Sequence, residues 1–134
     1  MSTFNLNIVI PDGEKYSGEA KSITVRTLGG DIQILAGHAD YLAALGTGRA
    51  KLVLADGRER WASLSGGFIS VSGGRVSVIT TTFEYAEEID LKRAENAKEK
   101  AERAISEAKN EAEAKLARAK LMRALCRISV GSTK

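Results

Sequence analysis

Apolar and polar residues alternate along the first part of the chain, and this pattern changes near residue 87. The segment 4–10, FNLNIVI, places apolar side chains on one side and Asn5 and Asn7 on the other, which is the period of a half-buried strand. Gly-Gly and Asp-Gly pairs, which favour tight turns between antiparallel strands, separate several of the later runs. These β-rich runs lie at 22–27, 31–35, 50–54, 60–65, 68–71 and 75–81. The pattern predicts an antiparallel β-sandwich or barrel over residues 1–86.

The second part of the chain has the composition of helix. From Leu91 to Ile128 there is no glycine or proline, and alanine is abundant. One apolar stripe comprises Leu91, Ala94, Lys98, Ala101, Ile105 and Ala108, and a second comprises Ala114, Ala117, Leu121, Leu125 and Ile128. The register changes near 109–111, where Asn110 supplies a helix N-cap. We therefore expect a C-terminal antiparallel two-helix hairpin within 87–134, in preference to one continuous helix.

The predicted hairpin has little to hold it closed. Its stripes are mostly alanine, so docking one helix on the other buries little apolar area. Pairs such as Glu99 with Arg103 support each helix separately through i,i+4 attraction. Two behaviours remain open from these residues alone: a hairpin that opens as a two-state element, or a docked hairpin that never moves.

Composition excludes several classes of protein. The single cysteine, Cys126, rules out an internal disulfide, and the single histidine, His38, rules out a multi-histidine metal site. No Ser-His-Asp set is supported, so no catalytic residue is assigned. No apolar run is long enough to cross a bilayer, and the N-terminus lacks a signal pattern. We expect no direct membrane insertion, and any association with a membrane must come through a partner.

Charge is distributed unevenly along the chain. The net charge is +3, residues 87–113 carry more acidic than basic side chains, and no acid follows Ala114. A nucleic-acid binder with a basic tail is one interpretation, and it predicts an affinity for DNA that falls steeply with salt. The absence of aromatic residues from that tail argues against it, so we expect no nucleic-acid partner.

Arginines are expected to gather at the base of the hairpin. Asp90 is placed to cap the first helix, yet Arg93 occupies the third helical position, where a capping box has Glu or Gln. Antiparallel docking about residue 109 brings Asp90 and Arg93 near Arg123 and Arg127. Guanidinium groups suit phosphate oxygens, and a carboxylate accepts from an amine or a ribose hydroxyl. The alternative is a solvated face on which one arginine pairs with Asp90.

Five stretches of the sequence, in this order and spacing, resemble one family. They are PDGEKYSGEA, GGDIQILAGHADYLAAL, SGGFISVSGGRVSVIT, EEIDLKRAENAKEKAERA and RALCRISV. The chain resembles the ε subunit of the bacterial F-type ATP synthase over nearly its whole length. The resemblance implies a sandwich of about ten strands followed by a helical hairpin. It also implies a non-catalytic rotor subunit at the foot of the central stalk, peripheral to the cytoplasmic face of the bacterial cell membrane.

The resemblance also implies partners and a regulatory role. The sandwich is expected to bind the γ subunit and the ring of c subunits, coupling the catalytic head to proton- or sodium-driven rotation. The hairpin is expected either to fold on the sandwich or to extend into the α/β catalytic head, where it inhibits ATP hydrolysis. Candidate contacts with that head are Lys115, Arg118, Lys120 and Arg123.

An ATP-binding motif of the family, Ile/Leu-Asp-x-x-Arg-Ala, reads Ile89-Asp90-Leu91-Lys92-Arg93-Ala94 in this chain. The candidate ATP-binding residues implied by the resemblance are Glu84, Ile89, Asp90, Arg93, Ala94, Arg123 and Arg127. We expect no required cofactor and no metal, with ATP as a regulatory ligand.

A loop at Gly37, His38 and Ala39 resembles the rotor-facing loop of the family. Ala36 and Asp40 stand where the family commonly has proline, which predicts a less rigid loop. An alternative function uses the same arginines: a free-standing ATP-sensing module whose hairpin folds on nucleotide. Co-purification with γ and the catalytic subunits distinguishes the two hypotheses.

Overall fold

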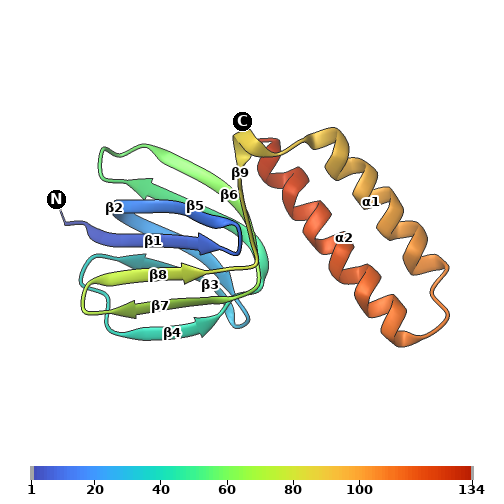
Figure 1. The fold of residues 1–134 in the computed structure, drawn as a ribbon, viewed down its shortest axis with the longest axis horizontal. Helices are drawn as coiled ribbons and strands as arrows, with labels where there is room; N and C mark the ends of the chain where they lie inside the picture. The colour runs from blue at the N-terminus through green and yellow to red at the C-terminus, as the bar shows by residue number, and fades with distance from the viewer. Residues whose placement is uncertain (1, 134) are drawn as a thin grey trace.

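The structure is a computed structural model that describes residues 2–133. Nine strands precede the helices: β1 Phe4–Ile10, β2 Gly13–Thr27, β3 Gly30–Leu35, β4 Tyr41–Ala44, β5 Thr47–Leu54, β6 Glu59–Ser65, β7 Phe68–Ser72, β8 Arg75–Ile79 and β9 Thr82–Tyr85. A 3₁₀ turn, η1 (Ala86–Glu88), leads to helices α1 (Leu91–Ser106) and α2 (Glu111–Gly131). The predicted fold class, a β-sandwich followed by a two-helix hairpin, is confirmed (Figure 1).

The strands form two layers joined by β2. The strand order is β4-β7-β8-β1-β2-β5-β6-β9, and β3 pairs with β2 beside this path. The first half of β2 pairs with β1, while its second half pairs with β3 and β5. Because one long strand serves both layers, the domain has nine named strands where the resemblance implies about ten.

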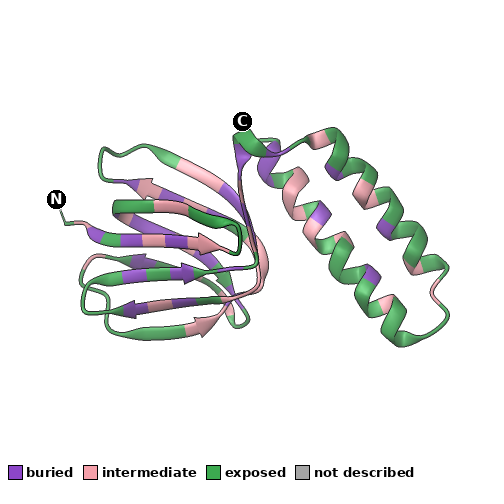
Figure 2. Ribbon diagram, in the orientation of Figure 1, coloured by how far each residue is buried: buried purple, intermediate pink, exposed green. Residues whose placement is uncertain are grey.

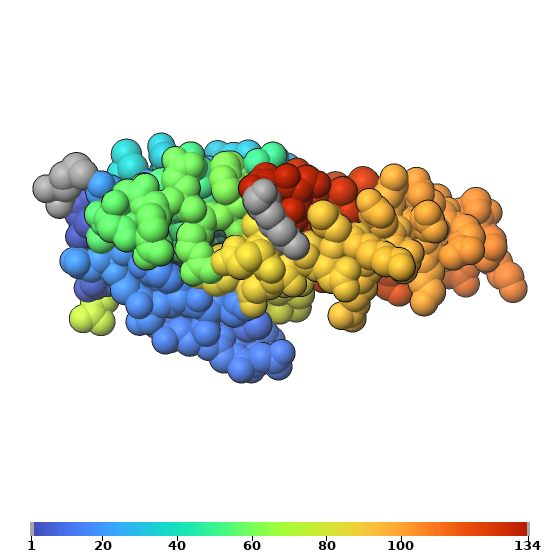
Figure 3. All heavy atoms as spheres, turned by 90° about the horizontal axis from the view of Figure 1, so that it is seen from above, coloured from blue at the N-terminus to red at the C-terminus, as the bar shows by residue number. Residues whose placement is uncertain are grey.

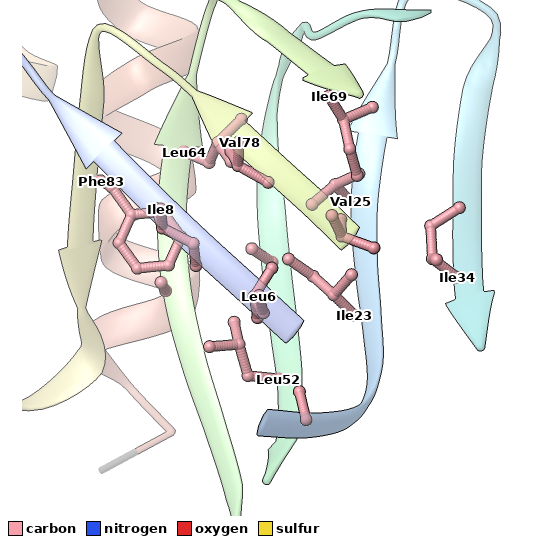
Figure 4. Close-up of a cluster of buried hydrophobic side chains, with 14 of the residues drawn as sticks. Leu6, Ile8, Ile23, Val25, Ile34, Leu52, Leu64, Ile69, Val78 and Phe83 are labelled. Atoms are coloured by element: carbon pink, nitrogen blue, oxygen red, sulfur yellow. The ribbon is translucent and has the colours of Figure 1, made fainter. Parts of the chain in front are cut away.

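The core lies between the two layers. Alternation is clearest in β1, which buries Phe4, Leu6 and Ile8 and leaves Asn5 exposed and Asn7 half-buried on the other side. Figure 4 shows Ile8 and Leu6 packed among side chains from β2, β5, β6, β8 and β9. The sequence pattern identified most of these strands. It missed β4, β9 and the first half of β2, where polar and small residues interrupt the alternation.

The helical region is divided where the sequence predicted. Asp90 caps α1 by accepting from the Arg93 backbone N–H at 3.1 Å, and Asn110 caps α2 by accepting from the Glu113 N–H at 2.9 Å. Residues 107–110 form the turn between the helices, which run antiparallel (Figure 1). The side-chain caps, and not glycine or proline, define this break.

Alanines form the contact between the two helices. The residues of this contact that are buried are Ala94 and Ala101 on α1 and Ala117 and Ala124 on α2. The predicted stripe on α2 was wrong at Leu125, which is 45% exposed because the helix turns Ala124 inward in its place. Small side chains let the helix axes approach closely but bury little area.

Among residues 2–133, the main contact of the hairpin with the sandwich is made by α2, which packs on β5, β6 and η1. Val130 packs with Ala86 and Ile89 in a small cluster that Trp61 and Cys126 cover from the side. Figures 1 and 3 show the far end of the hairpin projecting away from the strands, and Figure 2 shows that its surface is mostly exposed. Neither α1 nor α2, over the residues described, is long and apolar enough to cross a membrane.

Candidate functional site

A hollow of about 380 Å³ lies at the base of the hairpin, where the sandwich, η1 and both helices meet. Two stretches of the chain form its walls, the run from the end of β9 through η1 into α1 and the end of α2. Its lining residues are Glu84, Glu88, Ile89, Asp90, Arg93, Ala94, Ala97 and Arg127. Six of the seven residues that the sequence identified as candidate ATP ligands therefore lie around one space.

The first wall is the start of α1. Asp90 serves as the helix cap, and the Arg93 side chain three residues later is exposed to the hollow. No other described residue forms an ion pair with the Arg93 guanidinium. A free cation at a helix N-terminus is unfavourable, since the helix dipole is positive there. The two positive features together make this wall suited to an anion.

The opposite wall carries an ion pair. Arg127 of α2 donates through Nε to Glu84 Oε1 of β9 at 2.6 Å, and both side chains are about two-thirds buried. The alternative considered from the sequence was an arginine paired with Asp90. In the structure the arginine that forms an ion pair here, Arg127, pairs with Glu84 instead. This ion pair ties α2 to the edge of the sandwich and is the only one between them among residues 2–133.

Arg123 lies in an adjoining hollow and not in the first one. That second hollow, of about 370 Å³, is lined by Ala97, Lys100, Ala101, Ala104, Lys120, Arg123 and Arg127. Arg127 and Ala97 line both hollows, so the two hollows adjoin and both are lined by basic side chains. We expected Arg123 to meet Asp90 and Arg93 directly, but Arg123 is one helical turn from Arg127, toward the far end of the hairpin.

Several contacts fix the floor of the first hollow. Glu88 accepts from the Tyr85 backbone N–H at 2.9 Å and from Lys15 Nζ at 2.9 Å. Burial favours the neutral form of Glu88, but these two donors outweigh it and hold its pKa below the usual range. Burial also raises the pKa of Tyr85 to about 12, against the opposing effect of the Arg60 guanidinium stacked on its ring.

Glu87, the first acidic residue of this turn, pairs with Arg60 of β6. Together with Lys15 and Glu88, this pair fastens η1 to the sandwich on both sides. Two ion pairs thus connect the base of the hollow to the strands, while within residues 2–133 Arg127 alone connects α2 to them by charge.

The other basic residues identified in the tail lie away from the hollow. Lys115, Arg118 and Lys120 are exposed on α2, toward the far end of the hairpin. Arg118 pairs with Glu111 of the same helix at 2.5 Å, which leaves the two lysines without ion pairs in the described chain.

The loop at Gly37, His38 and Ala39 joins β3 to β4 and is mostly exposed. Gly37 has φ of 82°, a conformation that other residues rarely adopt. Asp40 accepts from the Gly73 backbone N–H at 3.2 Å, so this loop is attached to the β7–β8 turn. That side-chain bond is an anchor that a proline at this position does not provide.

Sequence reasoning missed an apolar surface on the outer face of the layer that contains β7 and β8. Phe68 and Ile79 lie opposite each other on these strands and are 56% and 62% exposed. Leu42 and Leu28 lie close by and are also exposed. The available signal was the phase of FISVS, in which Phe68 shares the outward side with the serines while Ile69 and Val71 point inward.

Residues 2–133 contain no cluster of His, Cys, Asp or Glu that suits a metal ion. The polar groups that line the first hollow are the carboxylates of Glu84, Glu88 and Asp90 and the guanidiniums of Arg93 and Arg127. Such a set binds anions and hydrogen-bonding ligands, and it lacks a nucleophile paired with a base.

Two family models match the chain and together span almost all of it. The model for the ATP synthase delta/epsilon chain β-sandwich domain matches residues 3–86, and the model for the long α-helix domain of the same chain matches residues 87–131. The two matches meet at η1, where the hollow begins.

Solved structures show the same arrangement. A chain of the mitochondrial ATP synthase of Euglena gracilis, solved with OSCP, F1 and the c-ring, matches with a TM-score of 0.80 and 28% identity. The match covers 91% of this chain and 77% of that one. A chain of the Tetrahymena thermophila mitochondrial ATP synthase central stalk and c-ring shares the fold with a TM-score of 0.62 at 15% identity, covering 95% of both chains.

Proposed function

Since the chain belongs to the ATP synthase delta/epsilon chain family and is therefore a non-catalytic subunit of the central stalk, we propose that its hairpin is a regulatory arm that restrains ATP hydrolysis. The observation that supports this role is the small joint between the two domains. A buried cluster, the Glu84–Arg127 ion pair and a hydrogen bond from Ser63 to Cys126 hold the C-terminal half of α2, which packs on β5 and β6. An arm held in this way is suited to leave the sandwich and return.

The sandwich is the part that we assign to the rotor. The exposed apolar surface around Phe68 and Ile79 provides a docking face for the γ subunit, since exposed apolar patches of this kind mark interfaces. The loop at Gly37, His38 and Ala39 lies at one end of the strands, where it is available to the c-ring. With these two contacts, the proposed location is the cytoplasmic face of a bacterial membrane, and the proposed role is to couple the catalytic head to proton or sodium flow.

The released hairpin presents its basic face to the catalytic head. Lys115, Arg118 and Lys120, with Arg123, are cations spread along and around α2, and together they suit an acidic surface of the α/β head. In the docked state Arg123 and Arg127 face the hollows at the base of the hairpin. Docking and inhibition therefore use overlapping parts of the same helix.

ATP is the ligand that we propose for the hollow. Its triphosphate suits Arg93 and the adjoining cations Arg123 and Arg127, and Asp90 and Glu84 provide acceptors for ribose or adenine groups. Ile89 and Ala94 form an apolar part of the lining. Because the walls come from both domains, bound ATP would stabilise the docked hairpin and so relieve inhibition.

Titration of the isolated chain with ATP tests this site. Arg93→Ala or Arg127→Ala is expected to weaken binding about tenfold, which is about 1.4 kcal/mol. Arg118→Ala is the matched control, since its side chain pairs with Glu111 far from the hollow. Equal affinity in all four proteins would remove these arginines from the site.

A reconstituted complex tests the inhibitory role. A full-length variant with Lys115→Ala, Arg118→Ala and Lys120→Ala is expected to assemble normally and to raise the ATP hydrolysis rate. Arg103→Ala, on the exposed face of α1, is the control and is expected to leave the rate unchanged. An unchanged rate in the triple variant would contradict an inhibitory contact through this face.

A further inference from the structure

A groove separate from the two hollows at the base of the hairpin, and larger than the candidate ATP site, lies on the other side of α2. Its volume is about 580 Å³, and it runs between the side of α2 and the outer face of β2 and β5. The charged and large apolar residues of its lining are Arg26, Asp31, Arg49, Lys51, Trp61, Met122 and Leu125. Figure 3 shows the end of α2 (red) lying directly beside the strands that form the other wall.

One wall of this groove is basic. Lys51 of β5 pairs across the sheet with Thr24 of β2 and with Trp61 of β6, so these residues share the outer face. Arg26 and Arg49 lie two residues further along their strands and therefore point to the same side. The basic wall is thus spread over two neighbouring strands.

The cations of this wall are not equivalent. Arg26 pairs with Asp31, and Lys51 pairs with Glu59 at 3.4 Å. Arg49 has no ion pair with any described residue, and its guanidinium carbon lies 4.5 Å from the centre of the Trp61 ring. A charged group stacked on an aromatic floor, with its donors still available, is suited to receive a carboxylate.

The opposite wall is apolar. Met122 and Leu125 of α2 are 60% and 45% exposed, although both are large hydrophobic residues. Cys126 and Ser129 continue this side of the helix for a further turn. From Met122 to Ser129 the wall is roughly 10 Å long, at about 1.5 Å per residue, which is the length of two helical turns.

We propose that this groove binds an acidic amphipathic segment of a partner protein, whose apolar side packs on Met122 and Leu125 while its carboxylates meet Arg49 and the neighbouring cations. Charge complementarity decides the class of partner, because the available charge in the groove is positive and lies opposite an apolar ridge. Arg49 is the cation of this wall that has no ion pair with a described residue, and the apolar ridge of two helical turns beside it suits a peptide better than a single headgroup. A short helix presents carboxylates three or four residues apart.

Occupation of the groove has a regulatory consequence. One wall belongs to the sandwich and the other to the hairpin, so the groove exists only while the hairpin is docked. A segment present at a hundred times its dissociation constant would shift the docking equilibrium about a hundredfold toward the docked state. This consequence rests on the proposed function, in which the hairpin undocks, whereas the binding itself does not.

Site-specific photo-cross-linking in the assembled complex tests the proposal. The photoreactive amino acid p-benzoylphenylalanine replaces Met122, the complex is irradiated, and cross-linked peptides are identified by mass spectrometry. Leu116 on the same helix is the matched control position, since it is 59% exposed and does not line the groove. We expect position 122, and not position 116, to cross-link to one acidic amphipathic segment of another subunit.

Charge reversal supplies the second arm. Arg49→Glu is expected to reduce the yield at position 122 at least tenfold, and Arg58→Glu, in the β5–β6 turn outside the groove, is expected to leave it unchanged. Cross-links to lipid, to a second copy of this chain or to a segment without acidic residues would overturn the proposal. So would the absence of a cross-link, or a yield that Arg49→Glu does not alter. Assembly and hydrolysis rate, measured on the same preparations, test the proposed function separately.

Discussion

Truncation of Val130 tests most directly whether the small buried cluster holds the hairpin against the sandwich. The Val130 side chain is fully buried, at 0% exposed, between Ala86 and Ile89 at the joint of the two domains. Val130→Ala removes two methyl groups, which at about 0.8 kcal/mol per buried carbon costs about 1.6 kcal/mol before any cavity term. The docked state is then expected to lose about fifteenfold in its equilibrium with the undocked state.

Trp61 reports this change without a label. It is the only tryptophan in the chain, and it covers the same cluster from β6. We expect the midpoint of its fluorescence transition in urea to fall by roughly 0.5–1.5 M in Val130→Ala, at a slope of about 1–3 kcal/mol/M. Circular dichroism at the same urea concentrations should show that the strands unfold later.

The control is Leu116→Ala, which removes more carbon from the same helix but at an exposed position. Its effect on the Trp61 transition should be within about 0.5 kcal/mol of zero. If Val130→Ala behaves like Leu116→Ala, the cluster does not hold the hairpin, and the account of a small joint between the domains is wrong.

Three further predictions concern other parts of the molecule. Gly67→Ala should destabilise the sandwich by roughly 3 kcal/mol, since its φ is 93° and a Cβ would overlap the backbone of Ile79, whereas Gly73→Ala, with open space around it, should cost only about 1 kcal/mol. Thermal unfolding measures both, and equal losses would contradict the steric argument. Glu88→Gln should lower stability at neutral pH; because the pKa of Glu88 is lower in the folded state, this contribution is lost as the pH falls through the folded value, so the two proteins should converge in acid. A difference between them that grows toward low pH would refute this sign. Asn110→Ala should cost about 1 kcal/mol of helix stability and speed amide exchange in the first turn of α2, and unchanged exchange would show that the cap is dispensable.

Much of the fold was predictable because it follows from local patterns. The outward asparagines of β1 and the capping side chains Asp90 and Asn110 are features that the sequence displays directly. The strand β4 was not predictable in this way. This strand forms by pairing with β7. Its largest aliphatic residue, Leu42, is exposed, so the segment lacks the alternation of buried and exposed residues that marks a strand.

The sequence predicted most of the residues that line the candidate site, but it did not predict which of them form ion pairs. The spacing of the arginines along α2 predicted that Arg127 meets the start of α1, which the shared hollow agrees with. The sequence could not show that Glu84, on a strand that the pattern missed, takes Arg127 as its partner. The sequence also could not show the groove beside Trp61, because even the nearest residues of its two walls, Trp61 and Met122, are 61 positions apart and meet only when the hairpin docks.

The one-ended attachment of the hairpin makes it a mechanical lever. A helix of the 21 residues of α2 is roughly 31 Å long at about 1.5 Å per residue, and its fulcrum is the buried cluster at its last turns. A rotation of roughly 20° about that fulcrum would move the far tip by about 10 Å while displacing the fulcrum side chains by only about 1–2 Å. Small shifts of side chains at the base, such as those that follow when Arg127 exchanges one partner for another, are thereby amplified. The tip of the hairpin moves by a distance as large as a helix diameter.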